Sequence, residues 1–201
     1  MAKLFLIMGK SASGKDTLYK DIVQRFADRL GVVVPYTTRP KRQGETEGVE
    51  YHFISEARMR RMEKEGKVIE SRCYQTVHGP WCYLTADDGQ IDLSKRSSIL
   101  IVTPPAYEKL RDYYGAEHVV PLYVETEDGE RLQRALKRER AQTEPKYEEM
   151  CRRFLADAKD FSEEVLAKLG IRKRYQNDSY ERVLDELCAE IEKECGREGI
   201  S

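Results

Sequence analysis

The chain alternates between uninterrupted apolar runs and amphipathic stretches. Residues 4–8 are all apolar, as expected for a parallel strand that is buried on both faces. Apolar residues then recur at helical spacing through Leu30, and Gly31 is placed to end that helix. Residues 32–34 predict a second short strand, which Pro35 closes.

The same alternation returns in the second half of the chain. Apolar runs predict strands at residues 98–102, 119–124 and 171–175. Helical spacing predicts helices at residues 104–114, 127–140, 147–169 and 180–195, with Pro145 separating the middle two. Strands that alternate with helices in this way predict an α/β fold, with a parallel sheet core and helices on both faces.

Between these two parts, residues 35–88 are richer in strand and turn residues and predict a small inserted lobe of mixed α/β structure. A polar, basic loop at residues 36–45 leads into a strand that ends at Ile54, and Ser55 is a suitable N-cap for a helix that Gly66 stops. Short strands are expected at 68–70 and 73–77, around a turn at 78–80. We therefore expect a core of residues 1–34, 89–137 and 154–195, a lobe of residues 35–88, a helical lid of residues 138–153 and a flexible tail of residues 196–201.

Composition excludes several classes of protein. The 201 residues carry a formal net charge of −1, which argues against a general nucleic-acid binder or a polybasic membrane protein. The sequence enters a strand directly, with no signal peptide and no apolar run of spanning length, so we expect a soluble cytoplasmic protein. The cysteines are odd in number and form no C-x-x-C pair, which predicts reduced thiols and no zinc site at Cys73, Cys82, Cys151, Cys188 and Cys195.

The turn between the first strand and the first helix carries the strongest motif. It fits G-x-x-x-x-G-K-[ST] except at the last position, where Asp16 stands. Backbone N–H groups and the positive end of a helix would face an anion there, and Lys15 adds a mobile cation. An ordinary strand-to-helix turn is the alternative. We predict a nucleotide-phosphate site made of Gly9, Lys10, Ser11, Ala12, Ser13, Gly14, Lys15, Asp16 and Thr17.

Two arginine clusters are candidates for further phosphate contacts. Arg39 and Arg42 lie three positions apart on a loop that Pro40 stiffens, so they could hold one phosphate from two sides, although a solvated charged loop is equally compatible. In the second cluster we expect Arg131 and Arg134 to form a solvated face with glutamate partners. The remaining arginines flank Pro145 and could close over a transferred phosphoryl group as a lid: Arg138, Arg140, Arg152 and Arg153.

Residues 36–45 and 48–53 together resemble the nucleotide-monophosphate segment of guanylate kinases. That pattern is T-T-R-x-P-R-x-G-E followed by G-x-x-Y-x-F, and it is specific. The phosphate loop, Glu70, the arginine-rich lid and Asn177-Asp178 also match in order, so the resemblance extends over roughly residues 3–195. It implies a P-loop NTPase-type core and transfer of the γ-phosphate of ATP, with Mg²⁺, to a nucleoside monophosphate, GMP first.

The resemblance also implies roles for single residues. Lys15 would bridge the β- and γ-phosphates, and Asn177 would lie near the ATP base. Glu70 would accept hydrogen bonds from the guanine N1–H and amine. The further residues implied on the GMP side are Thr38, Arg39, Arg42, Tyr51, Tyr83 and Thr103, of which Arg39, Arg42 and Tyr51 would hold the acceptor phosphate.

The chain departs from the family pattern near the base and the metal. Pro35 replaces a serine that contacts guanine, and Thr103 replaces an aspartate at a strand end. The G-x-Y-Y-G turn has become residues 79–83, shifted by an insertion, so Tyr83 is only a candidate for the lost phosphate tyrosine. Asp16 replaces the Walker hydroxyl and could serve Mg²⁺ directly or through water.

Three functions therefore remain open at this point. The first is a guanylate kinase, and the second is a kinase for another nucleoside monophosphate or small phosphorylated acceptor. The third, a non-catalytic guanylate-kinase-like binding module, is disfavoured because Gly9, Gly14 and Lys15 all remain. As partners we expect ATP and a nucleoside monophosphate, with no nucleic acid and no membrane, in a monomer or weak homodimer.

Overall fold

The computed structural model describes residues 1–42, 44–76 and 79–196. Its core is a five-stranded parallel sheet with the strand order β2-β7-β1-β8-β9. The central strand β1 (Leu4–Met8) is fully buried and pairs with β7 (Ser97–Ile101) on one side and β8 (Val119–Glu125) on the other. β2 (Leu30–Val32) and β9 (Arg174–Gln176) form the edges.

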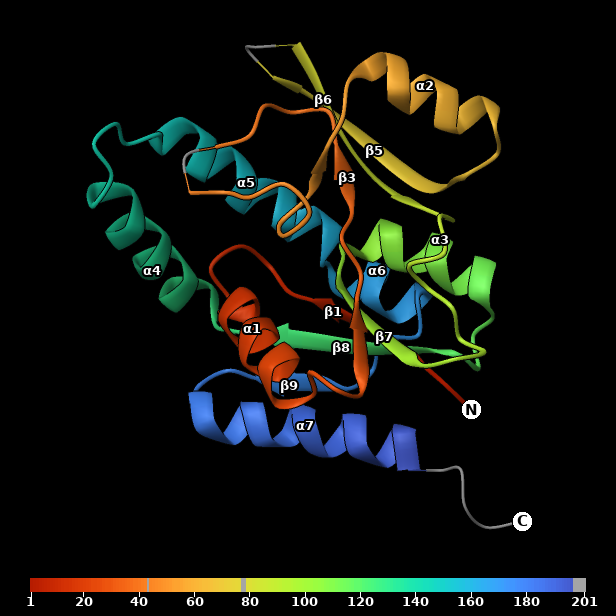
Figure 1. Ribbon diagram of the computed structural model, residues 1–201. Coiled ribbons are helices and arrows are strands. Elements are labelled where there is room, and N and C mark those ends of the chain that lie inside the picture. Colours follow the sequence, from red (N-terminus) through yellow and green to blue (C-terminus); the bar gives the residue numbers. More distant parts are fainter. Residues whose placement is uncertain (43, 77–78, 197–201) are drawn as a thin grey trace.

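Helices cover both faces of this sheet, as Figure 1 shows. Phe5 and Ile7 of β1 pack against α1 (Lys15–Arg25) and α7 (Tyr180–Gly196). Leu4, Leu6 and Met8 point to the opposite face, where α3 (Pro104–Tyr114) and α6 (Glu163–Lys168) lie. The two faces follow from strand geometry, because successive side chains point to opposite sides. The predicted α/β fold with a parallel core sheet is confirmed.

A second, four-stranded sheet lies beside the core in the order β4-β3-β6-β5. Its strands are β3 (Tyr36–Thr37), β4 (His52–Phe53), β5 (Val68–Thr76) and β6 (Gly79–Ala86). The helix α2 (Glu56–Lys64) begins at Ser55, whose side chain accepts a hydrogen bond from the Arg58 N–H, as the N-cap prediction required. Met59, Met62 and Leu84 are part of a small separate core beneath that helix.

Two further helices, α4 (Asp128–Arg140) and α5 (Tyr147–Asp160), pack against each other, and α5 is the one nearer the second sheet in Figure 1. α7 ends at Gly196, and the predicted flexible tail otherwise lies outside the described residues. Within the described residues, no helix combines the length and the apolar character that a bilayer span requires.

Two predicted helices end earlier than expected. α1 ends at Arg25 with Phe26 as its C-cap, and Gly31 lies in β2 instead of stopping the helix. A Cβ on Gly31 would lie 3.1 Å from the Ser98 Oγ, so this glycine serves close strand packing. The predicted helix 147–169 is two helices, because Ser162 starts α6 by accepting a hydrogen bond from the Val165 N–H.

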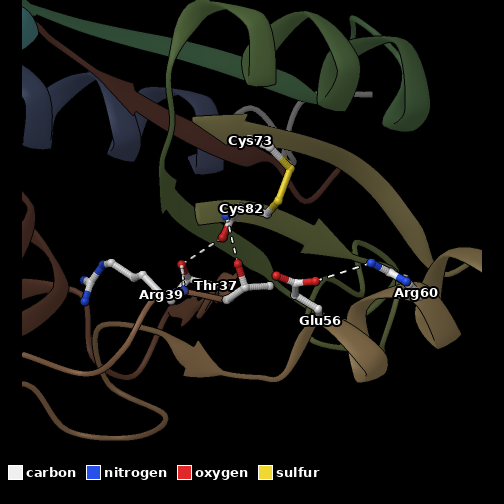
Figure 2. The surroundings of a disulfide bond; sticks show 7 residues. Thr37, Arg39, Glu56, Arg60, Cys73 and Cys82 are labelled. Carbon is white, nitrogen blue, oxygen red and sulfur yellow. Dashed lines mark hydrogen bonds and ion pairs between the residues drawn. A yellow bond between two sulfur atoms is a disulfide. The ribbon is translucent and has the colours of Figure 1, made fainter. Parts of the chain in front are cut away.

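The hairpin of the second sheet also differs from the prediction. β5 is one strand of nine residues, and residues 79–83 belong to β6 instead of a turn; residues 77–78 lie outside the described part. The register places Cys73 directly opposite Cys82, where they form a disulfide that Figure 2 shows. The prediction of reduced thiols is therefore wrong for this pair. Strand register brings the two cysteines together, and their spacing in the sequence does not indicate that they pair. Cys151, Cys188 and Cys195 are free.

Candidate active site

The phosphate loop requires glycine at two positions, Gly9 and Gly14. Gly14 has φ +87°, and a Cβ there would lie 2.4 Å from the Asn177 Nδ2. A Cβ on Gly9 would lie 2.7 Å from the Val124 carbonyl oxygen. Within the described part of the chain, the N–H groups of Gly14 and Lys15 have no protein acceptor. They lie at the N-terminus of α1, an arrangement suited to an anion.

A buried arginine holds this loop in place. Arg131 of α4 is 1% exposed and donates from Nε to the Ser11 carbonyl at 3.0 Å. Its guanidinium also pairs with Asp128 and, at 3.2 Å, with Asp157 of α5. Asp157 in turn accepts a hydrogen bond from the Ser11 N–H at 2.6 Å. The prediction of a solvated Arg131 is wrong, because tertiary contacts decide its burial. Arg134, 42% exposed with Glu130 4.0 Å away, does match the predicted solvated face.

The loop is also supported from the core sheet. Thr126 Oγ1 donates to the Ser13 carbonyl at 3.0 Å, and the buried Asn177 amide donates to the same oxygen at 2.7 Å. Asn177 thus stabilises the phosphate loop, and its role near an ATP base stays a prediction. Lys10 pairs with Asp128 at 3.1 Å, which ties the loop to α4 again.

Lys15 and Asp16 form an ion pair at the opening of the loop. Their side chains lie 2.9 Å apart, with Lys15 largely buried and Asp16 69% exposed. Burial acts to raise the pKa of Asp16, but the charge and hydrogen bond of Lys15, together with the Arg153 charge, outweigh it and lower that pKa. The carboxylate is therefore ionised at neutral pH. The same interaction places Arg153 of α5 within electrostatic range of the loop.

Arg39 lies in the basic loop just after β3, and its side chain is buried and paired. It is 3% exposed and donates from both Nη atoms to the Glu45 carboxylate, at 2.7 and 2.6 Å. Its guanidinium lies over the rings of Tyr51 and Phe53, at 5.0 and 5.4 Å. The Arg39 Nε is buried and has no partner among the described residues. Arg42 is exposed, and its backbone N–H donates to Glu45 at 2.8 Å.

Glu70 and Thr103, two residues predicted on the GMP side, are connected through a third residue, Arg72. The buried Glu70 accepts hydrogen bonds from Thr85 at 2.9 Å and from Arg72 at 3.0 Å. Arg72 also donates to Thr103, which precedes α3. Arg72 is not among the residues predicted from the sequence, although a residue two positions from Glu70 on a strand shares its face.

Two other predicted residues lie elsewhere in this sheet. Tyr83 lies between Tyr51 and Tyr74, with ring centroids 5.6 and 6.0 Å away. The Thr38 hydroxyl accepts from the Cys82 N–H at 2.9 Å. Thr38 is therefore engaged in holding β3 to β6, and Tyr83 belongs to an aromatic group beside Arg39.

The four lid arginines separate into two pairs. Arg152 of α5 forms two hydrogen bonds of 2.7 Å with Glu149, and its charge interacts with Tyr74 and Tyr83 of the second sheet. Arg153 interacts with Asp16. Arg138 and Arg140 are exposed at the end of α4, where no side-chain partner lies within the described residues. The structure therefore brings the α5 pair toward the phosphate loop and the second sheet.

Comparisons with known proteins show the family to which the chain is similar. The guanylate kinase family model matches residues 1–193. A guanylate kinase of Coxiella burnetii (strain RSA 493 / Nine Mile phase I) is 40% identical over 79 residues, which are 39% of this chain and 38% of that protein. One of Geobacter metallireducens (strain ATCC 53774 / DSM 7210 / GS-15) is 32% identical over 126 residues, 54% of this chain and 62% of that protein.

The alignments thus span about two fifths to three fifths of these relatives. The crystal structure of guanylate kinase from Anaplasma phagocytophilum shares the fold, with a TM-score of 0.62 at 21% sequence identity. That comparison covers 96% of this chain and 86% of the other.

Replacing Arg131 with methionine should lower the free energy of unfolding by about 3 kcal/mol, because Asp157 would keep a half-buried charge without its partner. Urea denaturation measures the difference. The matched control is Arg134→Met on the same helix, where the side chain is exposed and a change within about 0.5 kcal/mol is expected. Equal effects of the two substitutions would contradict the assigned role of Arg131.

The Arg39–Glu45 pair predicts a pH dependence of stability. Hydrogen bonds from Arg39 outweigh burial and lower the pKa of Glu45 to about 2, from an ordinary 4.5. A folded-state pKa below the unfolded one stabilises the fold above pH 4.5, and this contribution disappears as the pH falls toward 2.

Wild type should therefore exceed Glu45→Gln by about 2–3 kcal/mol in free energy of unfolding at pH 6, and this gap should close toward pH 2. Urea denaturation across that range measures it, with the exposed Glu63→Gln as control. A gap that does not change with pH would show that the pair is not ionic.

Proposed function

Since the match to its family model covers residues 1–193, this chain belongs to the guanylate kinase family, and we propose that it transfers the γ-phosphate of ATP to GMP. The products would be ADP and GDP. The observation that carries the proposal is a pair of anion sites whose charged residues, Asp16 on one side and Arg39 on the other, both act on Tyr51. One is the phosphate loop, where the N–H groups of Gly14 and Lys15 at the start of α1 have no acceptor in the described part of the chain. The other is Arg39, whose buried Nε has no partner among the described residues.

The two sites lie within electrostatic range of each other. Burial raises the pKa of Tyr51, and this hydroxyl is affected by charges from both sides: Arg39 on its own sheet and Asp16 on the phosphate loop. Phosphoryl transfer requires donor and acceptor phosphates to be held in line at short range. A tyrosine that is affected by both sites supports a shared cleft.

On the donor side, the N–H groups of Gly14 and Lys15 and the Lys15 ammonium would hold the β- and γ-phosphates. Mg²⁺ in proteins is held by one or two carboxylates together with substrate phosphates, and the ionised, exposed Asp16 fits that role, directly or through water. When bound with ATP, Mg²⁺ neutralises phosphate charge. In its absence, Asp16 neutralises Lys15.

On the acceptor side, Arg39 and Arg42 would bind the phosphate of GMP, with the Tyr51 hydroxyl as a third contact. The Glu45 carboxylate accepts hydrogen bonds from the Arg39 guanidinium and from the Arg42 backbone N–H. One carboxylate therefore orients both residues. No general base is needed, because the attacking phosphate oxygen is already anionic at neutral pH. Catalysis would then consist of positioning and charge neutralisation.

The lid would act through α5. Arg153 lies in range of Asp16 and Arg152 in range of the tyrosines of the second sheet, so both can approach the transferred phosphoryl group. Closing this helix over the cleft would exclude water and suppress ATP hydrolysis. Arg138 and Arg140, exposed at the end of α4, stay candidates for the same role.

Transfer to a different nucleoside monophosphate, or to another small phosphorylated acceptor, is the second candidate. It is favoured by Pro35, Thr103 and the Arg72–Glu70 contact at the expected base site. A non-catalytic binding module is less well supported, because Gly9 and Gly14 lie in contacts that exclude a side chain and Lys15 faces the loop opening.

The predicted oligomeric state and cytoplasmic location stay proposals. Disulfides such as Cys73–Cys82 are rare in a reducing compartment, and this finding argues against the cytoplasmic location.

Replacing Arg42 with alanine should lower kcat/KM for GMP roughly 100-fold, because a charge-assisted phosphate contact made in the transition state is lost. The KM for ATP should stay unchanged. A coupled assay for ADP formation with Mg·ATP measures both, with GMP, dGMP, AMP, CMP and UMP tested side by side. Arg60→Ala is the matched control, since Arg60 is exposed on α2 and pairs only with Glu56 in the described structure.

Turnover with another monophosphate would keep the mechanism and replace the acceptor. Unchanged activity of Arg42→Ala would contradict the acceptor site described here. If ATP binds but no monophosphate is phosphorylated, the binding-module alternative is favoured.

A further inference from the structure

The carboxylate expected to recognise the acceptor base is already occupied. The Glu70 side chain is 2% exposed, and both of its oxygens accept hydrogen bonds. Oε1 accepts from Thr85 at 2.9 Å and from the Arg72 Nη2 at 3.4 Å, and Oε2 accepts from the Arg72 Nε at 3.0 Å. A buried carboxylate requires such partners, because an unpaired charge is costly in a dry environment. An acceptor base would meet Arg72 before it could reach Glu70.

Arg72 is the accessible member of this cluster. Its side chain is 22% exposed, about ten times the fraction of Glu70. A guanidinium has five N–H donors, and three of them are used, two on Glu70 and one on Thr103. The remaining donors, one on each Nη, have no acceptor among the described residues. They are available to a ligand.

The position of Arg72 fits a base-binding role. It bridges β5 of the second sheet and Thr103 at the start of α3 in the core, the two parts between which an acceptor would lie. Its charge also acts on Tyr51, the proposed phosphate contact. On the α5 side, burial and Asp157 raise the pKa of Asp160, and Arg72 opposes them. Arg72 therefore lies within electrostatic range of the proposed phosphate contact Tyr51 and of Asp160 on α5.

We propose that Arg72 determines which base the enzyme accepts, by donating its free N–H groups to the O6 and N7 atoms of a 6-oxopurine. A planar guanidinium fork matches this pair of acceptors. Adenine carries an amine at position 6. This hydrogen-bond donor would face the donors of Arg72, so we expect the site to reject AMP. This inference deepens the proposed function and rests on it.

The same arrangement leaves the 2-amino group of guanine without a dedicated hydrogen-bond acceptor. Glu70 is engaged by Arg72, and Thr103 offers a hydroxyl that already accepts from Arg72. A site discriminates strongly against an analogue only when it holds a group dedicated to the missing atoms. Inosine monophosphate, which lacks only the 2-amino group, should therefore be phosphorylated nearly as well as GMP.

The first experiment compares kcat/KM for GMP, inosine monophosphate and AMP, using the full chain with Mg·ATP in the coupled assay. We expect GMP and inosine monophosphate to agree within about fivefold and AMP to be at least about 100-fold poorer, in line with the loss of a dedicated hydrogen-bond pair. A preference for GMP over inosine monophosphate of more than about 100-fold would overturn the inference and leave the proposed function intact.

The second experiment tests Arg72 itself. Arg72→Lys keeps a positive charge for Glu70 but loses the planar fork, so kcat/KM for both 6-oxopurines should fall by about tenfold or more. The KM for ATP and the urea midpoint should stay near the wild-type values, which separates base recognition from folding. Arg60→Lys is the matched control on the same lobe and should change none of these quantities.

Two outcomes would count against Arg72 in particular. Wild-type selectivity in Arg72→Lys would overturn its role, and so would an equal loss of activity toward AMP and the 6-oxopurines. Calorimetric titration with GMP in the absence of ATP measures GMP affinity alone. It therefore separates the role of Arg72 in base recognition from the proposed phosphoryl transfer. If wild type binds GMP but transfers no phosphate to it, the proposed function fails; if GMP affinity then falls in Arg72→Lys, the recognition role stands.

Discussion

The buried guanidinium of Arg131 is the contact on which the geometry of the phosphate loop depends. A charged group without solvent is tolerated only when its donors are satisfied, and Arg131 finds acceptors on three separate elements: the Ser11 carbonyl, Asp128 and Asp157. Because Asp157 also accepts the Ser11 N–H, the phosphate loop is fixed directly to α5. The loop that would hold ATP and the helix that would close over it therefore share one ion-pair network.

The same device recurs in the second sheet. Arg39 is buried against Glu45, and Arg72 covers Glu70, so each arginine is oriented by a carboxylate behind it while part of its guanidinium stays available. Rigid orientation suits phosphoryl transfer, in which positioning and charge neutralisation supply most of the rate. It also explains how a chain with a net charge of −1 can present several positive groups to one cleft.

Local sequence patterns predict those features of the molecule that depend on interactions between residues close in sequence. The apolar run of β1, the glycine-rich turn and the N-cap at Ser55 all follow from short-range sequence, and the structure has them at the expected positions. Burial of Arg131, the Cys73–Cys82 disulfide and the Arg72–Glu70 contact depend on partners set by tertiary packing or strand register. No periodicity along the chain encodes those contacts. The sequence does show that residues 70 and 72 share one face of a strand.

A crystal structure of the full chain with Mg²⁺, a non-hydrolysable ATP analogue and GMP would test the central claim most directly. The claim predicts the β- and γ-phosphates at the N–H groups of Gly14 and Lys15. It places the GMP phosphate against Arg39 and Arg42, with its oxygen in line with the γ-phosphorus. A GMP phosphate bound elsewhere, or an ATP analogue that leaves the loop empty, would contradict the account.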